Sequence, residues 1–258
     1  MNLSKRLETV ASFVPGGSNL ADIGTDHGYV PIFLAEQGRI GRALAMDVRK
    51  GPLMRAEEHI RAHGLADRID VRLSDGLEKL APGEADCVVI AGMGGELMIH
   101  ILEEGRHMWN SVRYWVLSPH SELDKVRRFL ERESFSIVRE TMIKEEGKYY
   151  TVMGITSPQP EVTEQSEKQE DEKCDGGGKK CGFKKETYEA KKESAYRYGK
   201  ILIEQKNPVL LEYLKKEEAT LRQIADSLAL KQTPASAARY EEIRKELEWN
   251  KEAQNEMQ

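Results

Sequence analysis

The sequence has 258 residues, 39% of them hydrophobic, and a formal net charge of −5. It contains no apolar run near the roughly 20 residues that cross a bilayer, and its first residues, M-N-L-S-K-R-L-E, lack the apolar core of a secretory signal. We therefore expect a cytoplasmic protein. The acidic net charge excludes a uniformly basic surface, but it does not exclude a local patch that binds nucleic acid.

The three cysteines do not form a disulfide framework. Cys87 falls in a predicted buried strand, whereas Cys174 and Cys181 lie in a polar tract with no histidine near them. The spacing C-x6-C without histidines is a poor zinc pattern. We expect no bound metal.

The first predicted element is a helix within residues 2–13. Its apolar residues recur at helical spacing, Ser4 is a candidate N-cap, and Pro15-Gly16-Gly17 ends it. Lys5 and Arg6 lie on this helix. They belong either to a solvated face or to a site that holds a cofactor carboxylate or a phosphate, with Arg6 the candidate cofactor contact.

The next stretch, N-L-A-D-I-G-T-D-H-G-Y-V-P (residues 19–31), predicts a strand that runs into a glycine-bearing turn and a helix. Such a unit builds a nucleotide pocket. Carboxylates at Asp22 and Asp26 would repel a pyrophosphate, whereas S-adenosylmethionine carries an ammonium, a sulfonium and ribose hydroxyls that favour negative charge or acceptors. The turn therefore predicts an S-adenosylmethionine site, with these candidate residues: Asp22, Gly24, Asp26, His27 and Gly28.

Two more acids follow predicted strands. Residues 42–48 form a second strand that contains Asp47, at the spacing expected for an acid that accepts hydrogen bonds from ribose hydroxyls. After a helix over 51–63, a strand over 69–73 is followed by Ser74-Asp75-Gly76. Asp75, with Gly76 beside it, is either a third cofactor contact or the N-cap of a helix that begins near Leu77.

A continuous apolar strand over residues 85–90 is typical of a central parallel strand, and it leads into A-G-M-G-G (residues 91–95). Three glycines in four positions let the backbone approach another molecule closely. Ala91 and Gly92 are candidate cofactor contacts, and Gly95 is a candidate substrate contact. The candidate catalytic backbone, whose carbonyls can accept hydrogen bonds from the amino group of a flat ring, is Gly92, Met93 and Gly94.

The pattern continues with a helix over 96–105, a strand over 114–117, a helix over 123–133 and a hairpin of strands over 136–144 and 148–156. The short connection predicts that the last two strands are antiparallel. This is the α/β order of a Rossmann-like class I methyltransferase domain. The helix over 123–133 is locally basic, as either a solvated face or an RNA-phosphate contact, through Lys125, Arg127, Arg128 and Arg132.

The C-terminal part changes in composition. We predict a methyltransferase domain over 1–156, a charged and disordered linker over 157–185, and a C-terminal α-helical coiled-coil hairpin over 186–258. Two apolar stripes predict this hairpin, which could pack on itself, on the main domain or on a partner. We therefore expect a monomer or a weak dimer through the helical tail. Candidate phosphate contacts at its start are Lys191, Lys192, Arg197 and Lys200.

These motifs resemble those of the bacterial tRNA (adenine-22-N1)-methyltransferases. The resemblance rests on L-S-K-R-L, A-D-I-G-T-D-H-G-Y-V-P, S-D-G-L, V-I-A-G-M-G-G, I-L-E-E-G and K-N-P-V-L-L-E-Y-L, and covers nearly the whole chain except the charged tract. It implies methylation of N1 of adenine 22 in tRNA by S-adenosylmethionine, a Rossmann-like domain and a coiled-coil tail. The family shows Q-P-N where this chain has Ser118-Pro119-His120.

Adenine N1 attacks a methyl group through its lone pair without deprotonation, so catalysis is mainly alignment and electrostatics. Asp26 is the candidate carboxylate near the N1 edge. His27 and Tyr29 are candidates to stack on or hydrogen-bond the base, although Tyr29 fits a packing role equally, and His120 is a further substrate candidate. The alternatives are a methyltransferase for another substrate and a non-catalytic S-adenosylmethionine-binding module whose tail recruits a partner.

Overall fold

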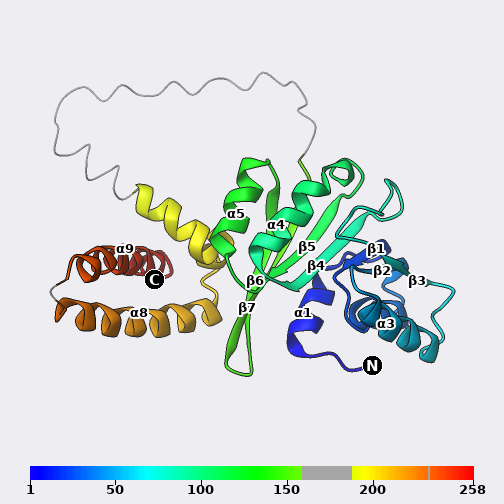
Figure 1. Cartoon of the computed structure of the whole chain (residues 1–258), viewed down its shortest axis with the longest axis horizontal. Coiled ribbons are helices and arrows are strands. Elements are labelled where there is room, and N and C mark those ends of the chain that lie inside the picture. The colour runs from blue at the N-terminus through cyan, green and yellow to red at the C-terminus, as the bar shows by residue number, and fades with distance from the viewer. Residues whose placement is uncertain (159–187, 232) are drawn as a thin grey trace, which may run out of the picture. The chain divides into compact units, whose positions relative to one another are not determined.

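The computed structural model describes residues 1–158, 188–231 and 233–258 (Figure 1). The chain divides into two compact units, Met1–Pro158 and Gln159–Gln258. Almost all of the predicted linker over 157–185 lies outside the described residues, so its predicted disorder stays a prediction.

The first unit is built on seven strands. They are β1 (Ser18–Ile23), β2 (Ile40–Asp47), β3 (Ile69–Leu73), β4 (Cys87–Met93), β5 (Tyr114–Pro119), β6 (Ser136–Glu145) and β7 (Lys148–Thr156). Their order in the sheet is β3-β2-β1-β4-β5-β7-β6. The first five in this order are parallel, and β7 is antiparallel to both of its neighbours, which confirms the predicted closing hairpin.

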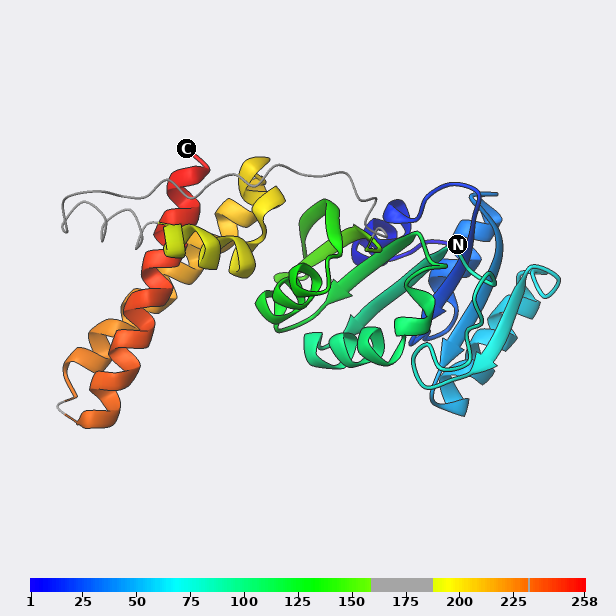
Figure 2. The same ribbon diagram turned by 90° about the horizontal axis from the view of Figure 1, so that it is seen from above.

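Helices cover both faces of this sheet (Figures 1 and 2). They are α1 (Lys5–Phe13), α2 (Tyr29–Glu36), α3 (Lys50–Ala62), α4 (Gly95–Glu104), the short η1 (Arg106–Met108) and α5 (Leu123–Arg132). Successive residues of β4 point to opposite faces, so that Cys87 and Val89 pack with α1, α2 and α3, whereas Val88 and Ile90 pack with α4 and α5. Burial on both faces explains why this strand is continuously apolar.

One predicted helix is absent. Residues 75–79 form turns between β3 and β4 instead of a helix near Leu77. The Ser74 hydroxyl accepts the Lys79 N–H at 3.1 Å, so Ser74 rather than Asp75 caps these turns. The capping alternative for Asp75 is therefore wrong, and its side chain stays exposed at the end of β3.

The first unit extends slightly past the predicted boundary at residue 156. The indole N–H of Trp115 donates to Ser157 Oγ at 2.8 Å, and this hydroxyl donates to the Val112 carbonyl at 2.6 Å. Trp115 is fully buried, so Ser157 satisfies a polar group of the core. The predicted domain limits stay a prediction, and a catalytic fragment must include Ser157.

The second unit is helical wherever the structure describes it. Residues 188–194 are helical and lead into the π-helical η2 (Ala195–Gly199), α7 (Lys200–Glu204), α8 (Pro208–Ala229) and α9 (Pro234–Glu256). The Asn207 side chain caps α8, and Thr233 forms a capping box with Ser236 at the start of α9. Helix α8 ends at Ala229 and α9 begins at Pro234, as two stripes joined by a short connection require.

Helices α8 and α9 lie side by side within this unit (Figure 2). Leu210, Leu214 and Leu221 of α8 are buried, as are Ile243 and Asn250 of α9, whereas Ile224 of the predicted stripe is 38% exposed. The two predicted helices are therefore present and pack on each other, whereas their coiled-coil packing stays a prediction.

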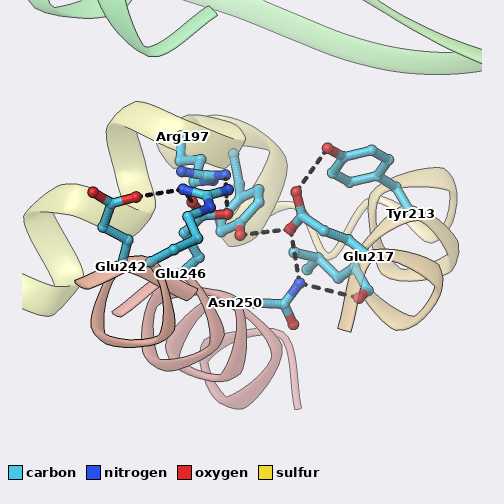
Figure 3. Close-up of polar contacts among 9 residues, drawn as sticks. Arg197, Tyr213, Glu217, Glu242, Glu246 and Asn250 are labelled. Atoms are coloured by element: carbon cyan, nitrogen blue, oxygen red, sulfur yellow. Dashed lines mark hydrogen bonds and ion pairs between the residues drawn. The ribbon is translucent and has the colours of Figure 1, made fainter. Parts of the chain in front are cut away.

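The hairpin also buries a polar network (Figure 3). The carboxylate of Glu217 accepts hydrogen bonds from Tyr198 and Tyr213 at 2.7 and 2.9 Å and from the Asn250 amide at 2.9 Å. The same amide donates to the Leu214 carbonyl at 3.0 Å. Because Tyr198 comes from η2, Glu217 from α8 and Asn250 from α9, the network specifies how these helices align.

None of the helices in the described ranges combines the length and apolar character needed to span a membrane.

Candidate active site

The turn after β1 has the backbone geometry that the glycines predicted. Gly24 and Gly28 both have positive φ, 75° and 66°, and the N–H groups of Gly24 and Thr25 donate to the Met46 carbonyl of β2 at 2.8 and 2.9 Å. A Cβ on Gly24 would lie 2.8 Å from Cε of Met93. The turn is thus tied to β2 and lies against the end of β4, with Gly24 exposed between them.

Two predicted acids lie deep at the ends of neighbouring strands. Asp22 of β1 is 7% exposed and Asp47 of β2 is 6% exposed. Burial raises the pKa of Asp22 to about 6; the nearby Thr25 lowers it in part, and the charge of Asp47 raises it further. Asp47 Oδ1 accepts the backbone N–H of Arg49 at 2.7 Å. A buried carboxyl whose ionised form is disfavoured gains stability from a cationic ligand.

The third acid lines a cavity. Asp75 and Gly76 border a cavity of about 630 Å³, together with residues of α4 and η1 that our sequence reasoning did not identify. This size lies within the range of small-molecule sites. The additional lining residues are Leu77, Glu78, His100, Ile101, Glu104 and His107. In the sequence, this side of the cavity is indicated only by the spacing of His100 and Glu104, which lie one helical turn apart on the same face of α4.

Polar atoms near the glycine turn lack partners. Thr25 Oγ1 and His27 Nδ1 are buried and make no bond of full hydrogen-bond geometry to any described residue. His27 also has a φ of 65°, in the left-handed region that favours glycine. Unsatisfied polar atoms and backbone strain in one turn are typical of a binding site.

His27 and Tyr29 stack on each other at 5.0 Å between ring centroids, and His59 of α3 stacks on both. Asp26 is exposed and forms an ion pair with Arg55 of α3 at 3.0 Å. The structure thus brings three predicted residues to the side of the turn that faces α3, together with His59 and Arg55, which the sequence did not single out.

The A-G-M-G-G segment divides into two parts. Gly92, with a φ of 83°, is exposed at the carboxyl end of β4, next to Ala91 and Met93. Gly95 is instead buried in α4; a Cβ there would lie 2.6 Å from the Ser121 carbonyl oxygen, and its N–H donates to Glu122 at 3.0 Å. Gly95 therefore serves helix packing, which corrects its predicted substrate contact.

Arg127 also requires a correction. It is 5% exposed, and its guanidinium donates to the buried carboxylate of Glu140 at 2.7 and 3.1 Å. This ion pair links α5 to β6 and removes Arg127 from the surface. Arg127 is therefore not a substrate contact, whereas Arg128 is partly exposed on the same helix.

His120 lies beside the end of β4, because its backbone N–H donates to the Met93 carbonyl at 2.9 Å. Its ring meets Tyr150 of β7 edge-on at 5.7 Å, and its Nε2 lies 3.5 Å from the Arg6 guanidinium. Partial burial and the charges of Arg6 and Lys148 lower the pKa of His120. The ring is therefore neutral near pH 7, beside the segment predicted to be catalytic.

Among the described residues, no three or more His, Cys, Asp or Glu side chains are grouped so that they could hold a metal ion.

Comparisons with known proteins agree with this geometry. A family model described as "Methyltransferase domain" matches residues 3–153. The tRNA (adenine(22)-N(1))-methyltransferase of Bacillus subtilis is 39% identical over 153 residues, which are 59% of this chain and 64% of that protein. The chain thus spans 64% of the length of this curated relative.

Solved structures match more of the chain. The crystal structure of Streptococcus pneumoniae Sp1610, a candidate tRNA (m1A22) methyltransferase, is 31% identical with a TM-score of 0.79, and the match covers 98% of this chain and 99% of that one. The structure of the same protein in complex with S-adenosyl-L-methionine has a TM-score of 0.76, with 98% and 99% covered.

The parallel strand order and the acids at the carboxyl edge of the sheet define a Rossmann-like protein of the methyltransferase class. The chain belongs to the methyltransferase-domain family, whose model matches more than half of its residues. The predicted class I methyltransferase fold is therefore confirmed.

Proposed function

We propose that this protein transfers a methyl group from S-adenosylmethionine to N1 of adenine 22 in tRNA. The observation that carries the proposal is the set of acids at three successive strand ends, Asp22, Asp47 and Asp75, around an exposed glycine turn. The similarity to the Bacillus subtilis and Streptococcus pneumoniae proteins supports the choice of reaction and substrate.

The cofactor contacts follow from charge. Asp22 faces the positively charged methionine end of the cofactor, Asp47 accepts hydrogen bonds from the ribose hydroxyls, and Asp75 with Gly76 borders the cavity beyond. Gly24 is exposed and lets the backbone approach the ligand, whereas Gly28, a predicted cofactor contact, is buried against Ile32, Ala56 and Ile60 and serves packing. The remaining proposed contacts, which surround the same turn, are Arg6, His27, Ala91 and Gly92.

S-adenosylmethionine supplies an electrophilic methyl group on a sulfonium. The adenine N1 lone pair forms the new N–C bond while the C–S bond breaks, and the product base becomes a cation. This chain therefore has to align the base and stabilise its growing positive charge. The proposed groups are the Asp26 carboxylate and the backbone of Gly92, Met93 and Gly94, with His120 beside them.

The target base must leave its stack in folded tRNA to reach this edge of the sheet. The stacked rings of His27 and Tyr29 offer an aromatic surface next to the turn. Arg128 stays a proposed phosphate contact. The tRNA partner implies action in the cytoplasm, and a monomer or a weak dimer through the helical tail stays part of this proposal.

The deciding experiment is a methylation assay with labelled S-adenosylmethionine on unmodified tRNA, followed by mapping of the modified position. We expect one methyl group at N1 of adenine 22. Methylation of another atom or substrate would favour a different methyltransferase, and cofactor binding without transfer to any tRNA would favour a non-catalytic binding module.

The role of Asp26 has its own test. Asp26→Ala should lower kcat by about 100-fold while S-adenosylmethionine affinity changes little, because its carboxylate is placed toward the base. Arg55→Ala is the control, because it removes the ion-pair partner and keeps the carboxylate. Equal losses in affinity and kcat for Asp26→Ala would place this residue in the cofactor site.

A further inference from the structure

The hairpin of β6 and β7 extends past the carboxyl end of β5. The last pair between β5 and β7 joins Leu117 to Met153, whereas pairs between β6 and β7 continue to Glu145 and Lys148. The first turn of α1 is attached to this extension, since Lys5 Nζ donates to the Lys144 carbonyl and the Arg6 N–H donates to Glu145, both at 3.3 Å. Two segments far apart in sequence thus form one surface.

We define the hairpin surface as Lys5, Arg6, His120, Lys148 and Tyr150. Lys5 and Lys148 are exposed. Within residues 1–158, 188–231 and 233–258, no carboxylate lies within 4.0 Å of the side-chain nitrogens of Lys5, Arg6 or Lys148. These three cations therefore keep their charge available for an anionic partner.

Aromatic rings lie among these cations. The Arg6 guanidinium lies 5.5 Å from the centroid of the Tyr150 ring, and the His120 ring meets the same tyrosine. Since the His120 N–H is bonded to the Met93 carbonyl, the surface continues directly into the end of β4. Cations interleaved with aromatic rings are the pattern that binds unpaired nucleic acid, because phosphates meet the cations while bases stack on the rings.

On the other candidate basic surfaces, most of the cations are paired with carboxylates of the protein. On α5, Lys125 pairs with Glu96, and Arg132 pairs with Glu103 and Glu133. In the helical unit, residues 188–258 contain 13 basic and 13 acidic side chains. Three of its four predicted phosphate contacts are also paired: Lys191 with Glu252, Arg197 with Glu246, and Lys200 with Glu204. A phosphate there would have to compete with a carboxylate.

We propose that the hairpin surface binds the RNA strand that carries the target nucleotide, with Lys5 and Lys148 on its phosphates and Tyr150 stacked on an unpaired base. This inference rests on the proposed function and adds the place where the RNA lies. Arg6 lies between this strand and Gly92, at the border with the cofactor site.

The test compares the full-length Lys5→Ala/Lys148→Ala variant with Arg113→Ala. Arg113 is 84% exposed in its side chain and precedes β5 at the opposite, amino edge of the sheet, so its loss is a control for removing one exposed positive charge elsewhere on the unit. Binding of unmodified tRNA is measured from 50 to 200 mM salt, S-adenosylmethionine binding by calorimetry, and methylation as KM and kcat for tRNA.

We expect the double variant to weaken tRNA binding by roughly tenfold at low salt, and to reduce the slope of log K against log salt by about 1.5, as the loss of two phosphate contacts requires. The KM for tRNA should rise by a similar factor, with cofactor affinity unchanged. Tyr150→Phe should bind tRNA like the wild type, and Tyr150→Leu should bind it more weakly.

Wild-type tRNA affinity and salt slope in the double variant would overturn the proposal, as would an equal loss in Arg113→Ala. Failure of the proposed function looks different: a wild-type protein that binds tRNA through these lysines but methylates another position keeps the hairpin surface and overturns the assigned reaction.

Discussion

The carboxyl edge of the sheet and the interior of the helical unit differ in how well their buried polar groups are hydrogen-bonded. At the sheet edge, Thr25 Oγ1 and His27 Nδ1 are buried and make no bond of full hydrogen-bond geometry within the described ranges, and burial raises the pKa of Asp22. In the helical unit, Glu217 and Asn250 satisfy one another and two tyrosines, although the buried Ser194 hydroxyl has no partner among the described residues. Unsatisfied groups favour a ligand, whereas satisfied groups specify a structure.

The same contrast applies to charge. Lys125, Arg127 and Arg132 on α5 and several cations in the helical unit are bonded to carboxylates of the protein, so they stabilise its own elements. Lys5 and Lys148 at the hairpin surface have no such carboxylate among the described residues. The number of basic residues in a segment is therefore a poor guide to where an anion binds. What matters is whether the basic side chains are already paired with carboxylates of the protein.

The largest expected effect concerns the buried pair of Arg127 and Glu140. Arg127→Ala should destabilise the first unit by about 3–5 kcal/mol, because it leaves Glu140 buried and unpaired. Urea unfolding followed by fluorescence of Trp109 and Trp115, both in this unit, measures the change. Arg132→Ala is the exposed control, with an expected cost below about 1 kcal/mol.

The double variant Arg127→Met/Glu140→Met should recover most of that stability, since it removes both charges. It should also bind tRNA like the wild type. If this double variant folds but binds tRNA more weakly than the wild type, Arg127 contacts RNA after all.

The next effect is the pH dependence caused by Asp22. Its pKa is about 6 in the folded protein and 3.8 in the reference state, so the folded state binds more protons between these values. The free energy of unfolding should therefore fall by about 3 kcal/mol as pH rises through this window, with the loss complete above pH 6. Asp22→Asn should remove this dependence and be more stable at pH 7, as thermal unfolding across pH would measure.

Cofactor affinity should rise over the pH range in which the free energy of unfolding falls. Affinity for S-adenosylmethionine should increase from pH 5 to pH 7, because the ligand favours ionised Asp22, and Asp22→Asn should lose most of it. Calorimetry in parallel with the unfolding series checks both. A stabilised Asp22→Asn protein with wild-type affinity would separate the buried acid from the cofactor site.

A smaller effect is expected in the helical unit. Asn250→Ala should weaken the packing of α8 on α9 by about 1–3 kcal/mol, because it removes the buried hydrogen bonds from Asn250 to the Leu214 carbonyl and the Glu217 carboxylate. Hydrogen exchange of α8 and α9 in the full chain measures this locally. Arg222→Ala, which removes an exposed pair with Glu218, should cost below about 1 kcal/mol; a similar loss in both variants would contradict a special role for the network.

The smallest expected effect is on cofactor binding by a fragment that ends at Pro158. This fragment keeps Ser157 with its bonds to Trp115 and Val112, and it contains every proposed cofactor contact. Its affinity for S-adenosylmethionine should equal that of the full chain, whereas methylation of tRNA should be lost. Full methylation by the fragment would leave the helical tail without a role in binding the substrate.

Much of the fold could be predicted because its signals are local. The strand over 69–73 was predicted at its observed limits, and β4 was recognised from its continuous apolar run. The glycine turn and the acids after β1, β2 and β3 followed from spacing alone. The helix expected near Leu77 was wrong, because Ser74 caps a series of turns in a connection that no periodicity described.

The sequence by itself determined the order of strands and helices, the glycines at positive φ and the acids at successive strand ends, since each depends on residues close together in the chain. Only the tertiary structure decided which charges remain available. Arg127 lies in a helix that is basic in sequence, yet Glu140, on a strand that follows, pairs with it in the core. Likewise Lys5 reaches the Lys144 carbonyl only because β6 and β7 extend past β5 and α1 packs against them, a contact between residues more than a hundred positions apart that no local pattern encodes.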